Sequence, residues 1–166
     1  TTAAGMVAVT EKALKEKFNL TLDGMKIAIL GGTGPVGIVS AAITAKAGAD
    51  VYIVGRNPEK TQKIVKECIT RYGTPNINVG VDEEKESLLS DTDIVFGTAA
   101  PGIEIMDEKL VRNSKKLKIC ADTNAVPPSG IYGVDVSDNV VEIKASPSGC
   151  YGVGALAIGN VKYKAQ

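Results

Sequence analysis

Residues 26–37 read KIAILGGTGPVG, and this stretch decides how the rest of the chain is interpreted. Lys26–Leu30 is a short apolar run of the kind that forms a buried strand. The glycines follow at once and contain the pattern G-x-G-x-x-G, which begins at Gly32. Residues 36–47 are helical in composition, and Gly48 is a suitable stop. The stretch therefore predicts a strand, a tight turn and a helix.

Strand-like and helix-like segments alternate along the remaining chain. Further strands are expected over residues 51–54, 77–81, 93–97, 117–121 and 140–145, and further helices over residues 2–17, 58–72, 83–90, 107–112 and 154–163. Such alternation predicts a parallel sheet covered by helices on both faces. We therefore predict one α/β domain over residues 1–166, a doubly wound, mostly parallel sheet of the Rossmann-like type.

Composition and charge restrict the classes of function. The chain has 166 residues, and its 19 basic residues balance its 19 acidic residues. No field of one sign would attract it to nucleic acid or to an anionic membrane, and we expect neither as a partner. The uncharged stretch from Ile27 to Ala45 is nearly as long as a membrane span, but its glycines and Pro35 break a helix. We therefore expect no membrane anchor and a cytoplasmic protein.

The chain has no histidine and three cysteines, Cys68, Cys120 and Cys150, which lie far apart. Histidine is the commonest metal ligand and the commonest general base near neutral pH. We expect neither a metal site nor a disulfide framework, and we assign no catalytic residue. Any chemistry must therefore rely on a cofactor or on a base supplied from elsewhere.

The glycine loop is expected to bind the pyrophosphate of a dinucleotide. Gly32 would allow the tight turn, Gly34 the close approach of the pyrophosphate, and Gly37 the close packing of helix on strand. The free N–H groups and the positive dipole end of the helix would face the phosphates. A strand-to-helix turn without a ligand is the alternative for this pattern.

The end of the second predicted strand distinguishes an NAD site from an NADP site. In NAD-binding domains an acidic residue ~20 residues beyond the glycines holds the ribose hydroxyls. This chain has VGRN at residues 54–57, with no acid. Arg56 suits a 2′-phosphate because its planar fork donates charge-assisted hydrogen bonds, and Lys60 adds a second positive charge. We therefore expect NADP rather than NAD.

Two more loops should lie beyond the carboxyl ends of strands, where ligands bind in doubly wound sheets. Residues 97–102 read GTAAPG, and these small side chains would let a cofactor ribose or nicotinamide lie against the backbone. Residues 122–130 read DTNAVPPSG and place polar groups where a strand finishes. For both loops, a structural role in turning or stiffening the chain is equally open.

Taken in order, these loops resemble a known family. GGTGPVG at 31–37, VGR at 54–56, ADTNAVPPSGI at 121–131 and GALAIG at 154–159 together resemble the NADP-binding domain of methylene-tetrahydromethanopterin dehydrogenases. These enzymes are similar to bacterial methylene-tetrahydrofolate dehydrogenases. The resemblance implies a role in one-carbon metabolism, in which a hydride passes from the methylene carbon of a reduced pterin to C4 of the nicotinamide.

The resemblance also implies roles for single residues. It would place the pyrophosphate on residues 33–36, the 2′-phosphate on Arg56 with Lys60, the nicotinamide ribose beside residues 98–100, and the ring near Asn124. The predicted cofactor residues are Gly32, Thr33, Gly34, Pro35, Val36, Gly37, Arg56, Lys60, Thr98, Ala99, Ala100 and Asn124.

Members of this family carry an N-terminal domain that supplies most of the pterin site, and we expect this chain to be the cofactor half alone. Residues 1–20 are then the helix that crosses from the missing domain, and residues 152–166 are a closing helix. We expect the tetrahydropterin substrate to bind through the missing domain and the protein to form a homo-oligomer. Two alternatives stay open: the NADP domain of a shikimate-dehydrogenase-like or glutamyl-tRNA-reductase-like enzyme, and a non-catalytic NADP-sensing module.

Overall fold

The computed structural model describes residues 1–165, and the side chains of residues 1–161. Their strands form one sheet in the order β3-β2-β1-β4-β5-β7-β6. The strands are β1 (Lys26–Leu30), β2 (Asp50–Gly55), β3 (Ile77–Val81), β4 (Ile94–Gly97), β5 (Ile119–Asp122), β6 (Asn139–Glu142) and β7 (Tyr151–Val153). Neighbouring strands are parallel except for β6, which pairs antiparallel with β7. The predicted doubly wound, mostly parallel, Rossmann-like sheet is therefore confirmed.

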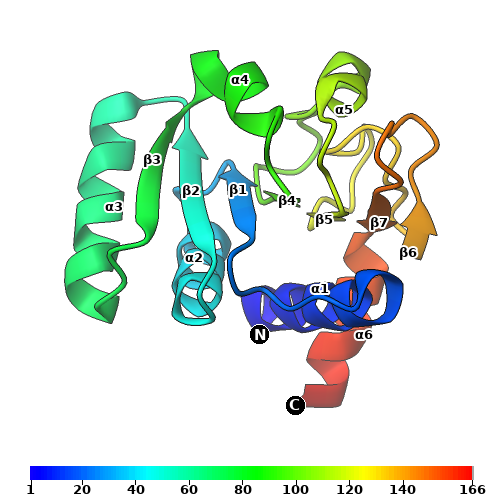
Figure 1. Cartoon of the computed structure of the whole chain (residues 1–166), viewed down its shortest axis with the longest axis horizontal. Coiled ribbons are helices and arrows are strands. Elements are labelled where there is room, and N and C mark those ends of the chain that lie inside the picture. Colours follow the sequence, from blue (N-terminus) through cyan, green and yellow to red (C-terminus); the bar gives the residue numbers. More distant parts are fainter. Residues whose placement is uncertain (166) are drawn as a thin grey trace.

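Helices cover both faces of the sheet. They are α1 (Thr2–Phe18), α2 (Pro35–Lys46), α3 (Pro58–Tyr72), the 3-10 helix η1 (Asp82–Glu84), α4 (Lys85–Leu89), α5 (Glu108–Asn113) and α6 (Ala155–Ala165). Helices α1, α2, α3 and α6 contribute to the apolar core on one face, and α4 and α5 to the core on the other. Figure 1 shows both termini at one end of the sheet, opposite the end to which the arrow of β2 points.

The central strand β1 shows why the apolar runs are continuous. Ile27 and Ile29 pack into the core shared with α1 and α2, whereas Ala28 and Leu30 pack into the core on the opposite face. A strand buried on both faces needs apolar side chains at every position rather than at alternate ones. The uncharged stretch that is nearly long enough for a membrane span is thus a buried strand followed by a helix.

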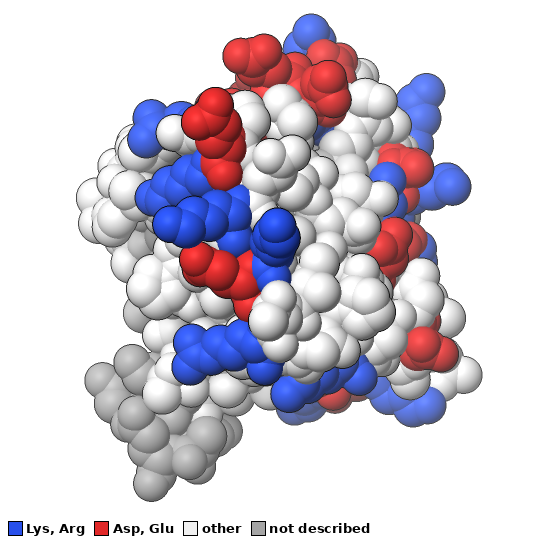
Figure 2. Space-filling model, turned by 90° about the vertical axis from the view of Figure 1, so that its left-hand side faces the viewer, with Lys and Arg blue, Asp and Glu red and all other residues white. Residues whose placement is uncertain are grey.

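The molecular surface carries both signs of charge. Figure 2 shows the face that includes α3, where basic and acidic side chains lie side by side. The three cysteines are buried and free. Within the described part of the chain, no helix combines the length and the apolar character needed to cross a membrane.

Strand β7 is the element that the sequence pattern missed. It has only three residues, with Gly152 in the middle, so residues 152 and 153 belong to a strand and not to the predicted closing helix. The strand forms because β5 offers it a parallel partner and β6 an antiparallel one. Strand β6 ends at Glu142, earlier than predicted, and its pairing is interrupted near Val140, whose φ is 58°.

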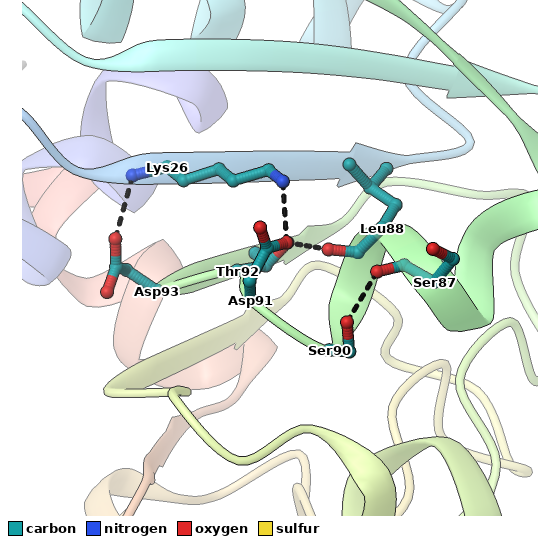
Figure 3. A network of polar contacts seen from close by, with 7 residues as sticks. All are labelled: Lys26, Ser87, Leu88, Ser90, Asp91, Thr92 and Asp93. Carbon is teal, nitrogen blue, oxygen red and sulfur yellow. Dashed lines mark hydrogen bonds and ion pairs between the residues drawn. The ribbon is translucent and has the colours of Figure 1, made fainter.

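A polar network fixes the amino ends of the central strands (Figure 3). The Nζ atom of Lys26 lies 2.6 Å from Oδ1 of Asp91, and the Lys26 backbone N–H donates to Oδ2 of Asp93 over 2.9 Å. The Nζ atom of Lys118 lies 2.6 Å from Oδ1 of Asp93. The Asp93 side chain is 18% exposed and that of Asp91 is 53% exposed. Asp93 therefore joins the starts of β1, β4 and β5 through largely buried contacts.

Replacing Asp93 by alanine should lower the free energy of unfolding by about 2 kcal/mol, because hydrogen bonds to charged groups contribute ~1.5–3 kcal/mol. Asp91→Ala is the matched control, since it breaks a more exposed ion pair and should cost less than about 1 kcal/mol. Urea denaturation followed by circular dichroism measures both losses. Equal losses in the two variants would contradict the role given to Asp93.

Candidate cofactor site

The glycine loop lies at the switch point of the sheet, between β1 and β4. From β1 the chain continues to β2 and β3 on one side, and β4 begins the other half. In doubly wound sheets a ligand cleft opens at this point. The Thr98 hydroxyl, just after β4, donates to the carbonyls of Leu30 and Gly31 over 3.0 and 3.2 Å. Two of the loops predicted to bind the cofactor are therefore in direct contact.

The three glycines of the motif have different surroundings. A Cβ on Gly32 would meet the carbonyl oxygen of Ile29 at 2.8 Å, and one on Gly37 would meet the Cα and carbonyl oxygen of Gly32 at 2.5 Å. The tight turn after β1 therefore requires Gly32, and the close packing of α2 against this turn requires Gly37. A Cβ on Gly34 would meet nothing within 4 Å among the described residues, and its φ of −86° suits any residue. Gly34 thus borders open space that a ligand can fill.

Helix α2 begins beside this space. Gly34 is its N-cap, Pro35 occupies the first turn, and no described side chain caps the helix. Backbone N–H groups of the first turn and the positive end of the helix dipole are thus left for a ligand or for water. The start of α2 can therefore stabilise an anion such as a phosphate.

Arg56 and Lys60 are exposed next to the same turn. Arg56 follows β2, and Lys60 lies in the first turn of α3, where its backbone N–H donates to the Oδ1 atom of Asn57 over 3.1 Å. A Cβ on Gly55 would meet Cγ2 of Thr33 at 2.7 Å, so the end of β2 lies against the glycine loop. The segment that carries the two cationic residues therefore begins against the glycine loop.

Asp122 is a buried carboxylate that organises the loop after β5. Its Oδ1 atom accepts from the Asn124 N–H over 3.0 Å and its Oδ2 atom from the Ile131 N–H over 3.1 Å. Burial raises the pKa of this carboxyl, although the N–H groups of Asn124, Ile131 and Gly130 favour the charged form. Sequence reasoning missed this role. The available signal was the tendency of aspartate to bind the backbone N–H two residues later.

Asn124 lies where it was predicted, beyond the end of β5, but protein groups occupy its amide. The Oδ1 atom accepts from the N–H of Gly102 over 3.2 Å and from the N–H of Val126 over 3.0 Å. The Nδ2 atom donates to the carbonyl of Pro128 over 2.7 Å. The side chain of Asn124 therefore connects the loop after β4 to the loop after β5.

The predicted site residues come together at one edge of the sheet. They belong to loops that follow β1, β2, β4 and β5, which are neighbours in the sheet. Ala99 is half-buried near Gly31, and Ala100 is exposed. The four loops combine backbone donors, two cations and a surface of small side chains, an arrangement that can accommodate an extended molecule with phosphate groups.

Gly37→Ser should destabilise the chain by about 1–3 kcal/mol, because its Cβ would overlap backbone atoms of Gly32 and force α2 away from β1. Gly34→Ser should leave the free energy of unfolding unchanged or slightly higher, because its Cβ meets no described atom and serine is a favoured N-cap. Urea denaturation of the two variants tests this difference. A comparable loss at both positions would show that Gly34 is also required by the fold.

Asp122→Asn should destabilise the chain by ~1–3 kcal/mol, because the amide turns an NH₂ group toward backbone donors. The size of this loss depends on pH. The pKa of Asp122 is raised in the folded chain, so the folded state binds its proton more tightly than the unfolded state. The free energy of unfolding of the wild type therefore falls as pH rises from the ordinary aspartate pKa through the raised one.

Asparagine does not titrate, so the stability gap between the wild type and Asp122→Asn should narrow as pH rises through that window. Urea denaturation of both proteins at a series of pH values, from acid to neutral, measures the gap. A gap that widens with rising pH would mean that the folded chain lowers the pKa of Asp122.

Comparison with known proteins extends this description. The family model described as NADP oxidoreductase coenzyme F420-dependent matches residues 26–124, more than half of the chain. The chain is 38% identical, over all of its length, to the NAD(P)-dependent methylenetetrahydromethanopterin dehydrogenase of Methylorubrum extorquens, and covers 56% of it. It is 35% identical, over 99% of its length, to the Bifunctional protein MdtA of the same organism, and covers 55% of it. The chain thus spans about half the length of these curated relatives.

Solved structures show the same fold. An L-alanine dehydrogenase superposes with a TM-score of 0.69 at 18% identity, over 98% of this chain and 52% of its own. A likeness at this identity concerns the fold alone. The resemblance to methylene-tetrahydromethanopterin dehydrogenases rests instead on the 38% identity, which confirms it.

Proposed function

Because the chain belongs to the family described as NADP oxidoreductase coenzyme F420-dependent, we propose that it is the NADP-binding domain of a dehydrogenase that transfers a hydride from a methylene-tetrahydropterin to NADP. The observation that carries the proposal is the 38% identity, over the whole chain, to a methylenetetrahydromethanopterin dehydrogenase. The open space at Gly34 and the two cations beside it support NADP as the cofactor.

In this proposal the phosphates bind at two neighbouring places. The pyrophosphate lies over Gly34, where the N–H groups and the dipole of α2 stabilise its charge. The 2′-phosphate lies between Arg56 and Lys60, and the arginine donates a planar pair of hydrogen bonds. The capping of α3 by Asn57 supports this role, because it holds the first turn of the helix that carries Lys60.

The nicotinamide end lies over residues 98–100. The hydroxyl of Thr98 is engaged by two carbonyls, so this segment presents mainly backbone and the methyl groups of Ala99 and Ala100. NADP, when bound, supplies the carbon that accepts the hydride. The residues of the chain hold that carbon in place and shield it from water.

The pterin is proposed to bind mainly outside these 166 residues. The curated relatives are about twice as long as the chain, which is consistent with a further domain that holds the substrate. Whether the pterin is a methanopterin or a folate depends on that part. Assembly as a homo-oligomer stays a prediction.

Arg56→Ala should weaken NADP binding about 10-fold to 100-fold, because a charge-assisted hydrogen bond contributes ~1.5–3 kcal/mol. The affinity for NAD, which lacks the 2′-phosphate, should stay the same. Arg71→Ala, at the far end of α3, is the matched control and should change neither affinity. Calorimetry with both dinucleotides measures the NADP to NAD affinity ratio, and an unchanged ratio in Arg56→Ala would overturn the assignment of the 2′-phosphate.

Turnover by the full-length protein tests the reaction. The substrates to compare with NADP are methylene-tetrahydromethanopterin, methylene-tetrahydrofolate and shikimate. Oxidation of either pterin supports the proposal, whereas oxidation of shikimate would assign the protein to a different dehydrogenase class. NADP binding without turnover of any of the three would favour a sensing module, and a lack of saturable NADP binding would overturn the cofactor itself.

A further inference from the structure

The amide of Asn124 has little capacity left for a ligand. Both lone pairs of its Oδ1 atom are used by the N–H groups of Gly102 and Val126, and one of its two Nδ2 hydrogens is used by Pro128. The residue is 8% exposed. Asn124 is therefore poorly suited to contact a cofactor directly, although it lies at the cofactor edge.

The loop after β4 is fastened at both of its ends. At its start, the N–H and the hydroxyl of Thr123 each donate to the carbonyl of Gly97 over 3.0 Å, and Thr98 is bonded to the carbonyls of Leu30 and Gly31. At its far end, the N–H of Gly102 donates to Asn124. The residues between these points, 99–101, include Ala99 and Ala100, over which the nicotinamide is proposed to lie.

Asn124 is itself held in place by a buried group. Its backbone N–H donates to the carboxylate of Asp122, which is the last residue of β5 and pairs with Gly97 of β4. A series of contacts therefore connects β5, through Asp122 and Asn124, to Gly102. The far end of the loop after β4 is therefore held by the side-chain amide of Asn124.

We propose that Asn124 is a positioning residue, which sets the place of the nicotinamide by holding Gly102 and thereby residues 99–101. The inference rests on the proposed function, because it requires a dinucleotide bound over this loop. A displacement of about 1 Å at the reacting atoms can reduce a rate ~100-fold. The affinity for NADP depends mainly on the phosphate contacts at Gly34 and Arg56. Loss of the amide should therefore reduce kcat far more than cofactor affinity.

Two variants separate the contacts between the loops from those within one loop. Asn124→Ala removes all of the contacts made by the amide. Asn124→Ser places a hydroxyl oxygen on Cβ, which can still accept from the N–H of Val126, as serine does in turns. The serine side chain is too short to reach the N–H of Gly102. Ser129→Ala, in the same loop, is the matched control, because Ser129 makes none of the side-chain contacts described for Asn124.

In the full-length protein, both Asn124 variants should lower kcat about 10-fold to 100-fold and change the NADP Kd less than about 3-fold. Amide exchange measured by NMR without cofactor supplies a second readout. The N–H of Gly102 should exchange about 10-fold faster in both variants, whereas that of Val126 should do so only in Asn124→Ala. Ser129→Ala should change none of these values.

A cofactor analogue distinguishes positioning from direct contact. If the free Nδ2 hydrogen of Asn124 bonded to the carboxamide oxygen of the nicotinamide, replacement of Asn124 would matter much less with the NADP analogue that carries a thioamide there, because sulfur is a weaker acceptor. Positioning predicts the same fold-loss in kcat with NADP and with the analogue. If Asn124→Ala fails to fold, Asn124→Ser carries the comparison alone.

Three results in the Asn124 variants would overturn the inference. They are an unchanged rate of hydrogen exchange at the Gly102 N–H, an unchanged kcat, or a loss of NADP affinity as large as the loss of kcat. If the wild type binds NADP and turns over a pterin while the Asn124 variants match it, this inference fails and the proposed function stands. If the wild type does not bind NADP, both fail.

Discussion

The contact between Gly37 and Gly32 is the constraint on which the rest of the structure depends. It brings the first turn of α2 against the end of β1, more closely than any side chain would allow. This packing places the N-terminus of α2 at the switch point of the sheet. The loops that follow β2 and β4 then pack against the same turn, the first through Gly55 and the second through Gly31. The position of the site is therefore set by backbone packing rather than by charged side chains.

The amino ends and the carboxyl ends of the strands are held by different interactions. At the amino ends of β1, β4 and β5, Asp93 joins the strands by accepting from the backbone N–H of Lys26 and by pairing with the partly buried ammonium group of Lys118. At the carboxyl ends, glycines, small side chains and backbone donors dominate, and the buried carboxylate of Asp122 binds only main-chain N–H groups among the described residues. Charged side-chain contacts thus join the strands at their amino ends, and the carboxyl ends keep backbone donors available for a ligand.

Local patterns predicted the fold well where the signal lies within one element. Helix α3 begins at Pro58 and ends before Gly73, two residues that mark helix ends. The three-residue strand β7 has no pattern of its own and depends on its neighbours. The bond from Gly102 to Asn124 joins residues 22 positions apart, and it depends on the register between Gly97 and Asp122. Sequence reasoning therefore found the loops that gather at the carboxyl ends of the strands, but not how these loops are connected.

Strand β6 lies at one edge of the sheet, where unpaired backbone groups can attract a strand from another molecule. Its register is broken between Asn139 and Val141. Val140 is β-branched and has a φ of 58°, a conformation that costs about 1–3 kcal/mol. A strand bent in this way is a poor template for continued pairing. The interruption at Val140 therefore limits how far another strand can pair along β6.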